Sequence, residues 1–317
     1  MTMQPLEDKT IQSTLNEKPG FHIWWRLLRP HTLTASFVPV FIGTMLAILD
    51  GSIHFLLFIV MLVAAMLIQA ATNMFNEYYD YVRGLDNENS VGIGGTIVRD
   101  GIPAKKVLRL ANIFFLLAML LGVYICLQSN WWVMAVGLVC MLFGYLYTGG
   151  PYPIASTPLG ELVSGFFMGT MLIGISYYVQ TMMIASDMIL ISIPVAIFIG
   201  MILLANNIRD LDNDKENGRK TIAVLLGQNK AITLLATCFI VSYGLTVIFI
   251  ISGILPIWSI IALLSGKKAK QAVDAFRGKK TNIEKIPAMV ATAQTNTIYG
   301  ALLGLSLLIQ IFIPFSL

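Results

Sequence analysis

Long apolar runs alternate with short polar segments along this chain of 317 residues. The runs approach or exceed the roughly 20 residues that a helix needs to cross a lipid bilayer. They lack the short alternation of apolar and polar positions typical of strands in a membrane barrel. The apolar segments lie at approximately 32–50, 54–80, 106–127, 131–148, 158–181, 188–210, 230–250, 251–265 and 294–315. This pattern predicts an all-α integral membrane protein, with about nine transmembrane helices in one bundle that encloses a central cavity.

Composition supports a membrane protein and excludes several other classes. Hydrophobic residues make up 56% of the chain and charged residues only 12%, which is outside the range of a soluble globular domain. The three cysteines lie singly in apolar runs, without the spacing of a zinc site, so we expect neither disulfides nor a metal held by thiolates.

The N-terminal segment differs from the rest of the chain. Residues 1–20 are polar and are expected to form a disordered cytoplasmic tail, without the apolar core and cleavage site of a signal peptide. Phe21 to Arg29 follows, with Trp24 and Trp25 suited to the headgroup layer, and we expect this segment to lie at the membrane interface. Residues 21–317 are expected to form a single transmembrane domain.

Basic residues are confined to one side of the predicted bundle. All 21 Lys and Arg lie in the N-terminal segment, or in and beside the connections after the second, sixth and eighth spans. Because Lys and Arg are enriched in cytoplasmic loops, the N-terminus and the connections 82–105, 211–229 and 266–290 are expected in the cytoplasm, the connections as loops. The net charge of +4 therefore indicates topology, and no motif suggests a nucleic-acid partner.

Polar side chains gather at the end of the second apolar run. Asn73, Asn76 and Asp80 are spaced by three and four residues, which places them on one face of a helix. Polar groups are costly in or near a bilayer, so we expect this face to border a cavity rather than lipid. Asp86 follows a few residues later.

A second group of the same kind ends the sixth run. Shifting the sequence by about 130 residues aligns Asn76 with Asn206 and Asp80 with Asp210, and Asp214 follows four residues on. The second and sixth spans are therefore predicted to be parallel, equivalent helices in two pseudo-repeated four-helix units, with one last helix added.

These two groups have the chemistry of a magnesium and diphosphate site. Carboxylate and amide oxygens suit Mg²⁺, which commonly takes its remaining ligands from a bound phosphate. Basic side chains that can contact phosphate oxygens lie nearby in the sequence: Arg83, Arg209, Lys215, Arg219 and Lys220. A diphosphate head with an apolar tail in the bilayer describes a polyprenyl diphosphate, and the magnesium would promote its ionisation. Aromatic rings that can shield the resulting carbocation are Phe143, Tyr145, Tyr147 and Tyr177.

Four stretches carry a resemblance to a known family: LRPHT (28–32), NEYYDYVRGLD (76–86), YTGGPYPIASTPLGE (147–161) and NNIRDLDNDKENGRKT (206–221). They resemble the intramembrane aromatic prenyltransferases of the UbiA superfamily, and most closely the branch that acts on 1,4-dihydroxy-2-naphthoate (MenA type). The resemblance implies that Asn76, Asp80, Asp86, Asp210 and Asp214 hold Mg²⁺ and diphosphate, with catalysis assigned to Asn76, Asp80, Asp210 and Asp214. It implies prenyl transfer to the naphthoate with loss of CO₂ and diphosphate, which gives demethylmenaquinone. It also implies that the protein lies in a bacterial cell membrane with its active site facing the cytoplasm.

Some roles stay open at this point. Asn73 and Asn207 either bind substrate or bond neighbouring helices, and Arg29 either anchors the chain at the interface or binds the acidic substrate. The candidate substrate-binding residues are thus Arg29, Asn73, Arg83, Tyr145, Tyr147, Asn206, Asn207, Arg209, Arg219 and Lys220. Glu77, Asp212 and Glu216 are expected to be solvated. Alternative functions are prenyl transfer to another aromatic acceptor such as 4-hydroxybenzoate, and cation-coupled transport through a site between repeated helices.

Overall fold

The computed structural model describes residues 20–86 and 95–315, so the expected tail lies outside the described residues except for Gly20. All regular secondary structure in these two ranges is helical. The long helices are α3 (Pro30–Leu49), α4 (Phe55–Val82), α6 (Ala104–Gln128), α7 (Trp132–Leu146), α10 (Ser186–Arg209), α13 (Gln228–Ile251) and α15 (Asn282–Phe312). Another continuous helix has three parts, α8 (Gly160–Gly165), the π-helical η2 (Phe166–Met171) and α9 (Leu172–Thr181).

Shorter elements connect these helices. They are α2 (Phe21–Leu27), α5 (Thr96–Arg99), the 3₁₀ turn η1 (Ile154–Ser156), α11 (Leu211–Glu216) and α12 (Ile222–Leu226). The 3₁₀ segment η3 (Ile257–Ser265) runs directly into α14 (Gly266–Phe276). In the described ranges, seven helices are long and apolar enough to cross a membrane: α3, α4, α6, α8–η2–α9, α10, α13 and α15. The protein is therefore a multi-pass membrane protein.

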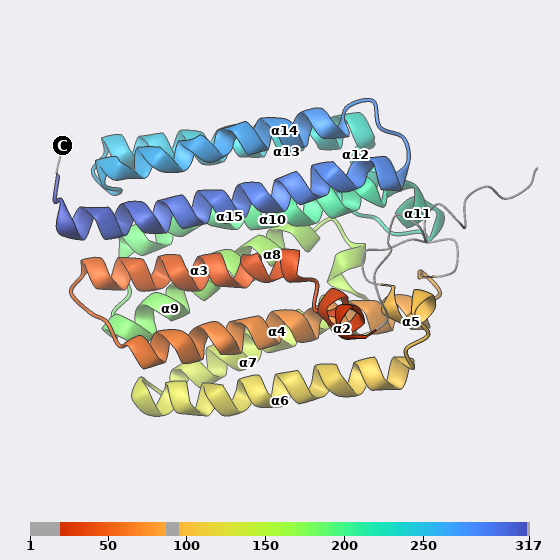
Figure 1. The fold of residues 1–317 in the computed structure, drawn as a ribbon, viewed down its shortest axis with the longest axis horizontal. Coiled ribbons are helices and arrows are strands. Elements are labelled where there is room, and N and C mark those ends of the chain that lie inside the picture. Colours follow the sequence, from red (N-terminus) through yellow and green to blue (C-terminus); the bar gives the residue numbers. More distant parts are fainter. Residues whose placement is uncertain (1–19, 87–94, 316–317) are drawn as a thin grey trace, which may run out of the picture.

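The long helices lie side by side along the longest axis of the molecule (Figure 1). α2, α5 and α11 gather at one end of the bundle, and the C-terminus lies at the other. Close packing between α3 and α15 depends on two glycines of α15. A Cβ at Gly300 would lie 2.1 Å from Val38, and one at Gly304 would lie 2.1 Å from Phe41. Small residues allow transmembrane helices to approach in this way.

The structure corrects the predicted eighth span and the connection after it. Within the predicted 251–265, residue 251 ends α13, a turn follows it, and the 3₁₀ segment η3 begins only at Ile257. The connection 266–290 was predicted to be a loop, yet it contains α14 and the first turns of α15. α14 is an amphipathic helix: it buries Ala269, Ala272 and Val273 and directs its lysines outward. Its high content of charged residues concealed the helical spacing of its apolar residues in the sequence. The last helix begins at residue 282 and not at 294, since Thr281 and Glu284 form a capping box there.

The other two polar connections also contain short helices, α5 in one and α11 and α12 in the other. α2 lies at the end of the long helices, as expected for the aromatic entry segment, and its Trp24 and Trp25 are exposed. α4 and α10, which correspond to the second and sixth predicted spans, both end at the same end of the bundle as α11 (Figure 1). The two groups of polar residues are thereby brought to one place.

Candidate active site

The two acidic groups meet through one arginine. Arg219 donates from Nη2 to Asp80 Oδ1 at 2.6 Å and from Nη1 to Asp214 Oδ1 at 3.2 Å. Asp80 is on the last turn of α4 and Asp214 is in α11, so residues far apart in the sequence form one cluster. We call Asp80, Asp214 and Arg219 the central triad. The sequence predicted the meeting of the two groups, and Arg219 only as a phosphate contact.

The first acidic motif continues past the end of α4. Gly84 adopts a left-handed conformation (φ 73°), which lets the chain turn back. The amide of Asp86 then donates to the backbone oxygen of Asp80 at 3.3 Å. Burial raises the pKa of the Asp86 carboxyl to about 6; the neighbouring Asp80 carboxylate adds to the rise, and Arg29 opposes it.

The second acidic motif contains two carboxylates with different surroundings. Asp210, between α10 and α11, is bound by its own neighbour: Arg209 donates to its two oxygens at 2.7 and 2.5 Å. Arg209 is buried, and its third nitrogen lies 3.1 Å from the sulfur of Met289 on α15. Asp214 is only 3% exposed, and burial raises the pKa of its carboxyl to about 6 although Arg219 opposes the rise. Asp214, and not Asp210, is therefore the residue of the second motif that pairs with Arg219.

The donor atoms fit a hard divalent cation. Among the described residues, no hydrogen-bond partner is present for the buried oxygens Asn76 Oδ1 and Asp214 Oδ2, which leaves both available to bind an ion. Within those same ranges, no three His, Cys, Asp or Glu side chains lie close enough together to hold a metal by themselves. These side chains could therefore supply only part of a coordination shell for a metal ion. Mg²⁺ in proteins usually takes the remainder from water and substrate phosphate.

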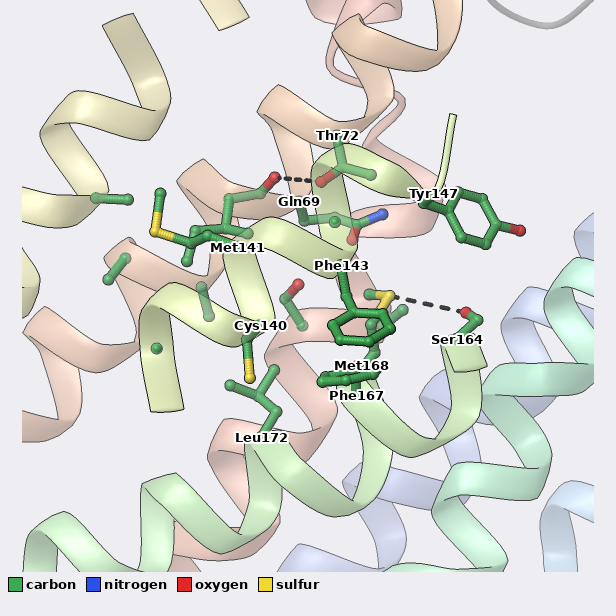
Figure 2. A pocket seen from close by; sticks show the side chains of 18 of the residues that line it. Gln69, Thr72, Cys140, Met141, Phe143, Tyr147, Ser164, Phe167, Met168 and Leu172 are labelled. Carbon is green, nitrogen blue, oxygen red and sulfur yellow. Dashed lines mark hydrogen bonds between the residues drawn. The ribbon is translucent and has the colours of Figure 1, made fainter. Parts of the chain in front are cut away.

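An apolar cavity of about 240 Å³ opens beside this cluster. Arg29, Asn76, Tyr147 and Asn206 line its polar end, and aliphatic and aromatic side chains of α4, α6, α7 and η2 line the remainder. Figure 2 shows Phe143 and Phe167 against one another in the cavity wall; their rings are stacked with centroids 4.3 Å apart. This combination of a charged mouth and an apolar interior suits an amphiphile with an anionic head.

Asn73 and Arg29 hold the junction of α2 and α3 at the cavity. Asn73, which is 4% exposed, donates from Nδ2 to the backbone oxygen of Leu28 and to Thr32 Oγ1, both at 2.9 Å. It therefore bonds a neighbouring helix and also lines the cavity. Arg29 has a left-handed backbone (φ 51°) between the two helices, a strained position for a non-glycine residue. Its charge acts on Asp86, so it faces the acidic cluster.

Other predicted substrate-binding bases lie elsewhere or are already engaged. Arg83 donates to the backbone oxygens of Thr148 and Gly150 at 2.5 and 2.7 Å, so it fixes the turn after α7. The side chains of Lys215 and Lys220 are exposed. Asn206 lines the cavity, as the predicted repeat with Asn76 requires.

The four aromatic candidates divide into two pairs. Phe143 and Tyr147 line the cavity, and the buried hydroxyl of Tyr147 has no partner among the described residues. Tyr145 does not line it, because its hydroxyl bonds that of Tyr79 at 2.7 Å in a separate apolar cluster. The hydroxyl of Tyr177 donates to the carboxylate of Asp50, the residue that follows α3. Asp50 and Arg29 lie at opposite ends of α3, so Tyr177 is far from the triad and the prediction that it shields a carbocation there is wrong.

Two glutamates were misjudged or missed by the sequence reasoning. Glu77 was expected to be solvated but is only 1% exposed; its carboxylate accepts from Thr96 Oγ1 and from the amide of Ile97, and so ties α4 to α5. Glu161 was overlooked. It is 5% exposed and accepts from Asn207 Nδ2 at 2.9 Å, which shows that Asn207 bonds a neighbouring helix. The available signal was an acidic residue at the start of an apolar run, which is rare without a function.

A buried lysine was also missed. Lys285 lies in the first turns of α15, is fully buried, and its amine has no direct partner among the described residues. Assignment of this segment to a loop concealed it. Asp212 and Glu216, by contrast, are exposed as expected.

Three comparisons bear on these features. A model of the UbiA prenyltransferase family matches residues 36–283. The chain is 53% identical over 290 residues to the 1,4-dihydroxy-2-naphthoate octaprenyltransferase of Bacillus subtilis, covering 92% of this chain and 93% of that protein. It is 30% identical to the enzyme of the same name from Haemophilus influenzae, covering 68% and 72%. A UbiA homologue from Archaeoglobus fulgidus, solved with GPP and Mg²⁺, shares the fold with a TM-score of 0.61 at 16% identity, covering 89% of this chain and 99% of that one.

Proposed function

The chain belongs to the UbiA prenyltransferase family, and we propose that it transfers a polyprenyl group from polyprenyl diphosphate to 1,4-dihydroxy-2-naphthoate. The ring carboxylate leaves as CO₂ and the donor loses diphosphate, which gives demethylmenaquinone in its reduced form, a step of menaquinone biosynthesis. The observation that carries the proposal is the central triad at the mouth of an apolar cavity, in a chain with 53% identity to an enzyme named for this reaction.

At the polar end, the proposed ligands of a divalent cation are Asn76, Asp80, Asp86, Asp210 and Asp214. When bound, Mg²⁺ would neutralise charge on the diphosphate and so make it a better leaving group. Arg219 holds Asp80 and Asp214 in place and can offer its guanidinium to phosphate oxygens as the donor binds. The structures of a UbiA homologue from Archaeoglobus fulgidus bound to GPP and Mg²⁺ and to DMAPP and Mg²⁺ support this assignment.

In the apolar part, the proposed role of the chain is to hold the prenyl tail and exclude water. Phe143, Phe167 and Tyr147 present aromatic rings in the cavity wall, and ring faces attract a developing cation. The C–O bond of the donor breaks with its electron pair going to diphosphate, and a ring carbon of the acceptor bonds the prenyl carbon. Loss of CO₂ returns the electron pair of the carboxyl–ring bond to the aromatic system, so no further oxidant is required.

For the acceptor, we propose that Arg29 binds the carboxylate of the naphthoate. Arg29 lines the cavity at its polar end and is held there by the junction of α2 and α3. Guanidinium groups suit carboxylates because the two are planar and can form paired hydrogen bonds. This location supports a role in substrate binding over a purely interfacial anchor.

We also propose that α7 and the η3–α14 rod cross the membrane, which would bring the total to nine crossings. Figure 1 shows the rod that ends in α14 running alongside α13 and α15, and both η3 and α14 contact these two helices. The N-terminus and the triad would then face the cytoplasm of a bacterial cell, as the one-sided distribution of Lys and Arg supports. Attachment of a membrane-impermeant maleimide to single cysteines near the triad, in inverted and in right-side-out vesicles, tests this orientation.

Purified protein supplied with a prenyl diphosphate, Mg²⁺ and equal amounts of dihydroxynaphthoate and 4-hydroxybenzoate tests the function. We expect mass spectrometry to detect only a prenylated, decarboxylated naphthalene, with equimolar release of diphosphate. Consumption of 4-hydroxybenzoate instead would support the other acceptor. Cation flux into protein-containing vesicles without diphosphate release would support the transporter and contradict prenyl transfer.

A further inference from the structure

The cavity extends far from the triad toward the opposite end of the bundle. Its lining residues on α4 run from Asn76 to Met61, a separation of fifteen positions, or about 22 Å along a helix. At its far end the wall is formed by the end of α6 and the start of α7, including Cys126 and Val133. A straight tail bound with its head at the triad would therefore pass between α4, α6 and α7.

Two glycines lie on this path without a packing reason. Gly122 of α6 and Gly137 of α7 both line the cavity, and a Cβ at either position would meet no atom within 4 Å. Gly300 differs, because it is needed for close contact between α3 and α15. Glycine inside a helix lowers the stability of the helix relative to alanine. Glycine at these two positions therefore lowers helix stability and leaves empty volume inside the cavity.

The same part of the cavity reaches the outer surface of the bundle. Met119 and Leu138 line the cavity, yet 39% and 42% of their surface is exposed. They lie on the same helices as the two glycines: Met119 is about one turn before Gly122, and Leu138 directly follows Gly137. α6 and α7 are neighbours at the edge of the bundle (Figure 1). An apolar chain too long for the cavity can thus continue between these helices into lipid.

We infer that Gly122 and Gly137 determine how well the enzyme accepts long prenyl chains relative to short ones, by keeping open the far part of the tail cavity and the way out between α6 and α7. This inference rests on the proposed function, since it concerns the tail of the same donor. A side chain larger than hydrogen at either position projects into the path of the distal isoprene units and leaves the head and first units undisturbed. A short donor does not reach these positions.

Competition between two donors tests the inference. Wild type, Gly122→Leu, Gly137→Leu and the double variant receive equal concentrations of geranyl and octaprenyl diphosphate with dihydroxynaphthoate, and both products are quantified by mass. We expect the ratio of octaprenyl to geranyl product to fall by about tenfold or more in each variant. This is the discrimination between substrates that one or two added carbon atoms in an apolar pocket commonly produce. The matched control is Gly244→Leu on α13, which also has open space at its Cβ but does not line the cavity, and whose ratio should stay that of wild type.

An unchanged ratio in both single variants and in the double variant would overturn the inference. If the leucine variants make no product from either donor, Gly122→Ala and Gly137→Ala decide the question: a lower ratio supports the role of the glycines and an unchanged one refutes it. Failure of the proposed function gives a different result, because wild type would then form no prenylated naphthalene from either donor.

Discussion

The acidic motif at the end of α4 and the one at the end of α10 share the Asn-x-x-x-Asp spacing, but their carboxylates have different partners. Asp80 reaches across the site to Arg219, whereas its sequence equivalent, Asp210, is bound on both oxygens by the adjacent Arg209. The residue of the second motif that reaches Arg219 is Asp214, one helical turn later. Equivalent positions in a repeat thus perform different tasks, because only one side of each helix end faces the partner motif.

This difference separates charges that build the site from charges that support it. The central triad joins the two acidic motifs. Among the described residues, one oxygen of its Asp214 and the side-chain oxygen of the nearby Asn76 have no hydrogen-bond partner. The pair of Arg209 and Asp210 is packed against α15 through Met289 and stabilises the helix end. The comparison can be tested by removing one charge at a time.

The largest effect is expected for Asp80→Asn. The substitution removes a proposed metal ligand and one anchor of Arg219, so turnover should fall well beyond the ~10–100-fold typical of a lost supporting partner. Product formation in detergent or liposomes measures it, and elution volume with thermal unfolding confirms that the variant folds. Wild-type turnover in this variant would contradict the proposed role of the first motif.

The second motif should respond differently at its two aspartates. We expect Asp214→Asn to lower kcat/KM by at least about tenfold more than Asp210→Asn, a difference of ~1.4 kcal/mol in transition-state stabilisation. Asp210→Asn leaves the buried Arg209 without its counter-charge, so it should lose more stability, by ~3 kcal/mol. Steady-state kinetics and chemical unfolding of the two variants provide the measurement. Equal losses of both properties in both variants would show that the motif acts as one unit.

The pH dependence tests one carboxylate from each motif. Asp86 and Asp214 have pKa values raised to about 6, mainly by burial, and a metal ligand must be deprotonated. The Mg²⁺ concentration needed for half-maximal activity should therefore rise by roughly fivefold per carboxylate between pH 6 and pH 5. In metal-free protein the trend is reversed, because a raised pKa favours the protonated carboxyl in the folded state. The contribution of these two groups to the free energy of unfolding is fully present below the ordinary pKa of 3.8 and is lost as the pH rises through about 6. A flat Mg²⁺ requirement across this range would contradict metal binding by these groups.

The smallest effect is expected for Asp212→Asn, which serves as the matched control for the second motif. Asp212 lies between Asp210 and Asp214 in the sequence but is exposed on the other side of α11. Surface substitutions of this kind usually change stability by no more than ~0.5 kcal/mol, and turnover should stay within about twofold of wild type. A loss like that of Asp214→Asn would show that net charge of the loop, and not the position of a carboxylate, controls activity.

The sequence was sufficient for features that depend on local pattern. Apolar run length predicted a helical membrane protein, and the family resemblance pointed to the prenyltransferase reaction that the 53% identity to a naphthoate prenyltransferase supports. The spacing of Asn76 and Asp80, repeated at Asn206 and Asp210, predicted a site built from two helix ends. The predicted span boundaries were wrong where a helix contains many charged residues, as α14 does, because the prediction relied on hydropathy alone.

Partner choice was decided only by the tertiary structure. Sequence could not show that Arg219 links Asp80 to Asp214 while Arg209 binds Asp210, since all three acids and both bases are compatible with the same motif. The burial of Glu77, the pairing of Glu161 with Asn207 and the empty volume at Gly122 and Gly137 depend on which helices are neighbours. The physical reason is that periodicity fixes the face on which a side chain lies, whereas its hydrogen bonds and the space around it depend on the helix packed opposite.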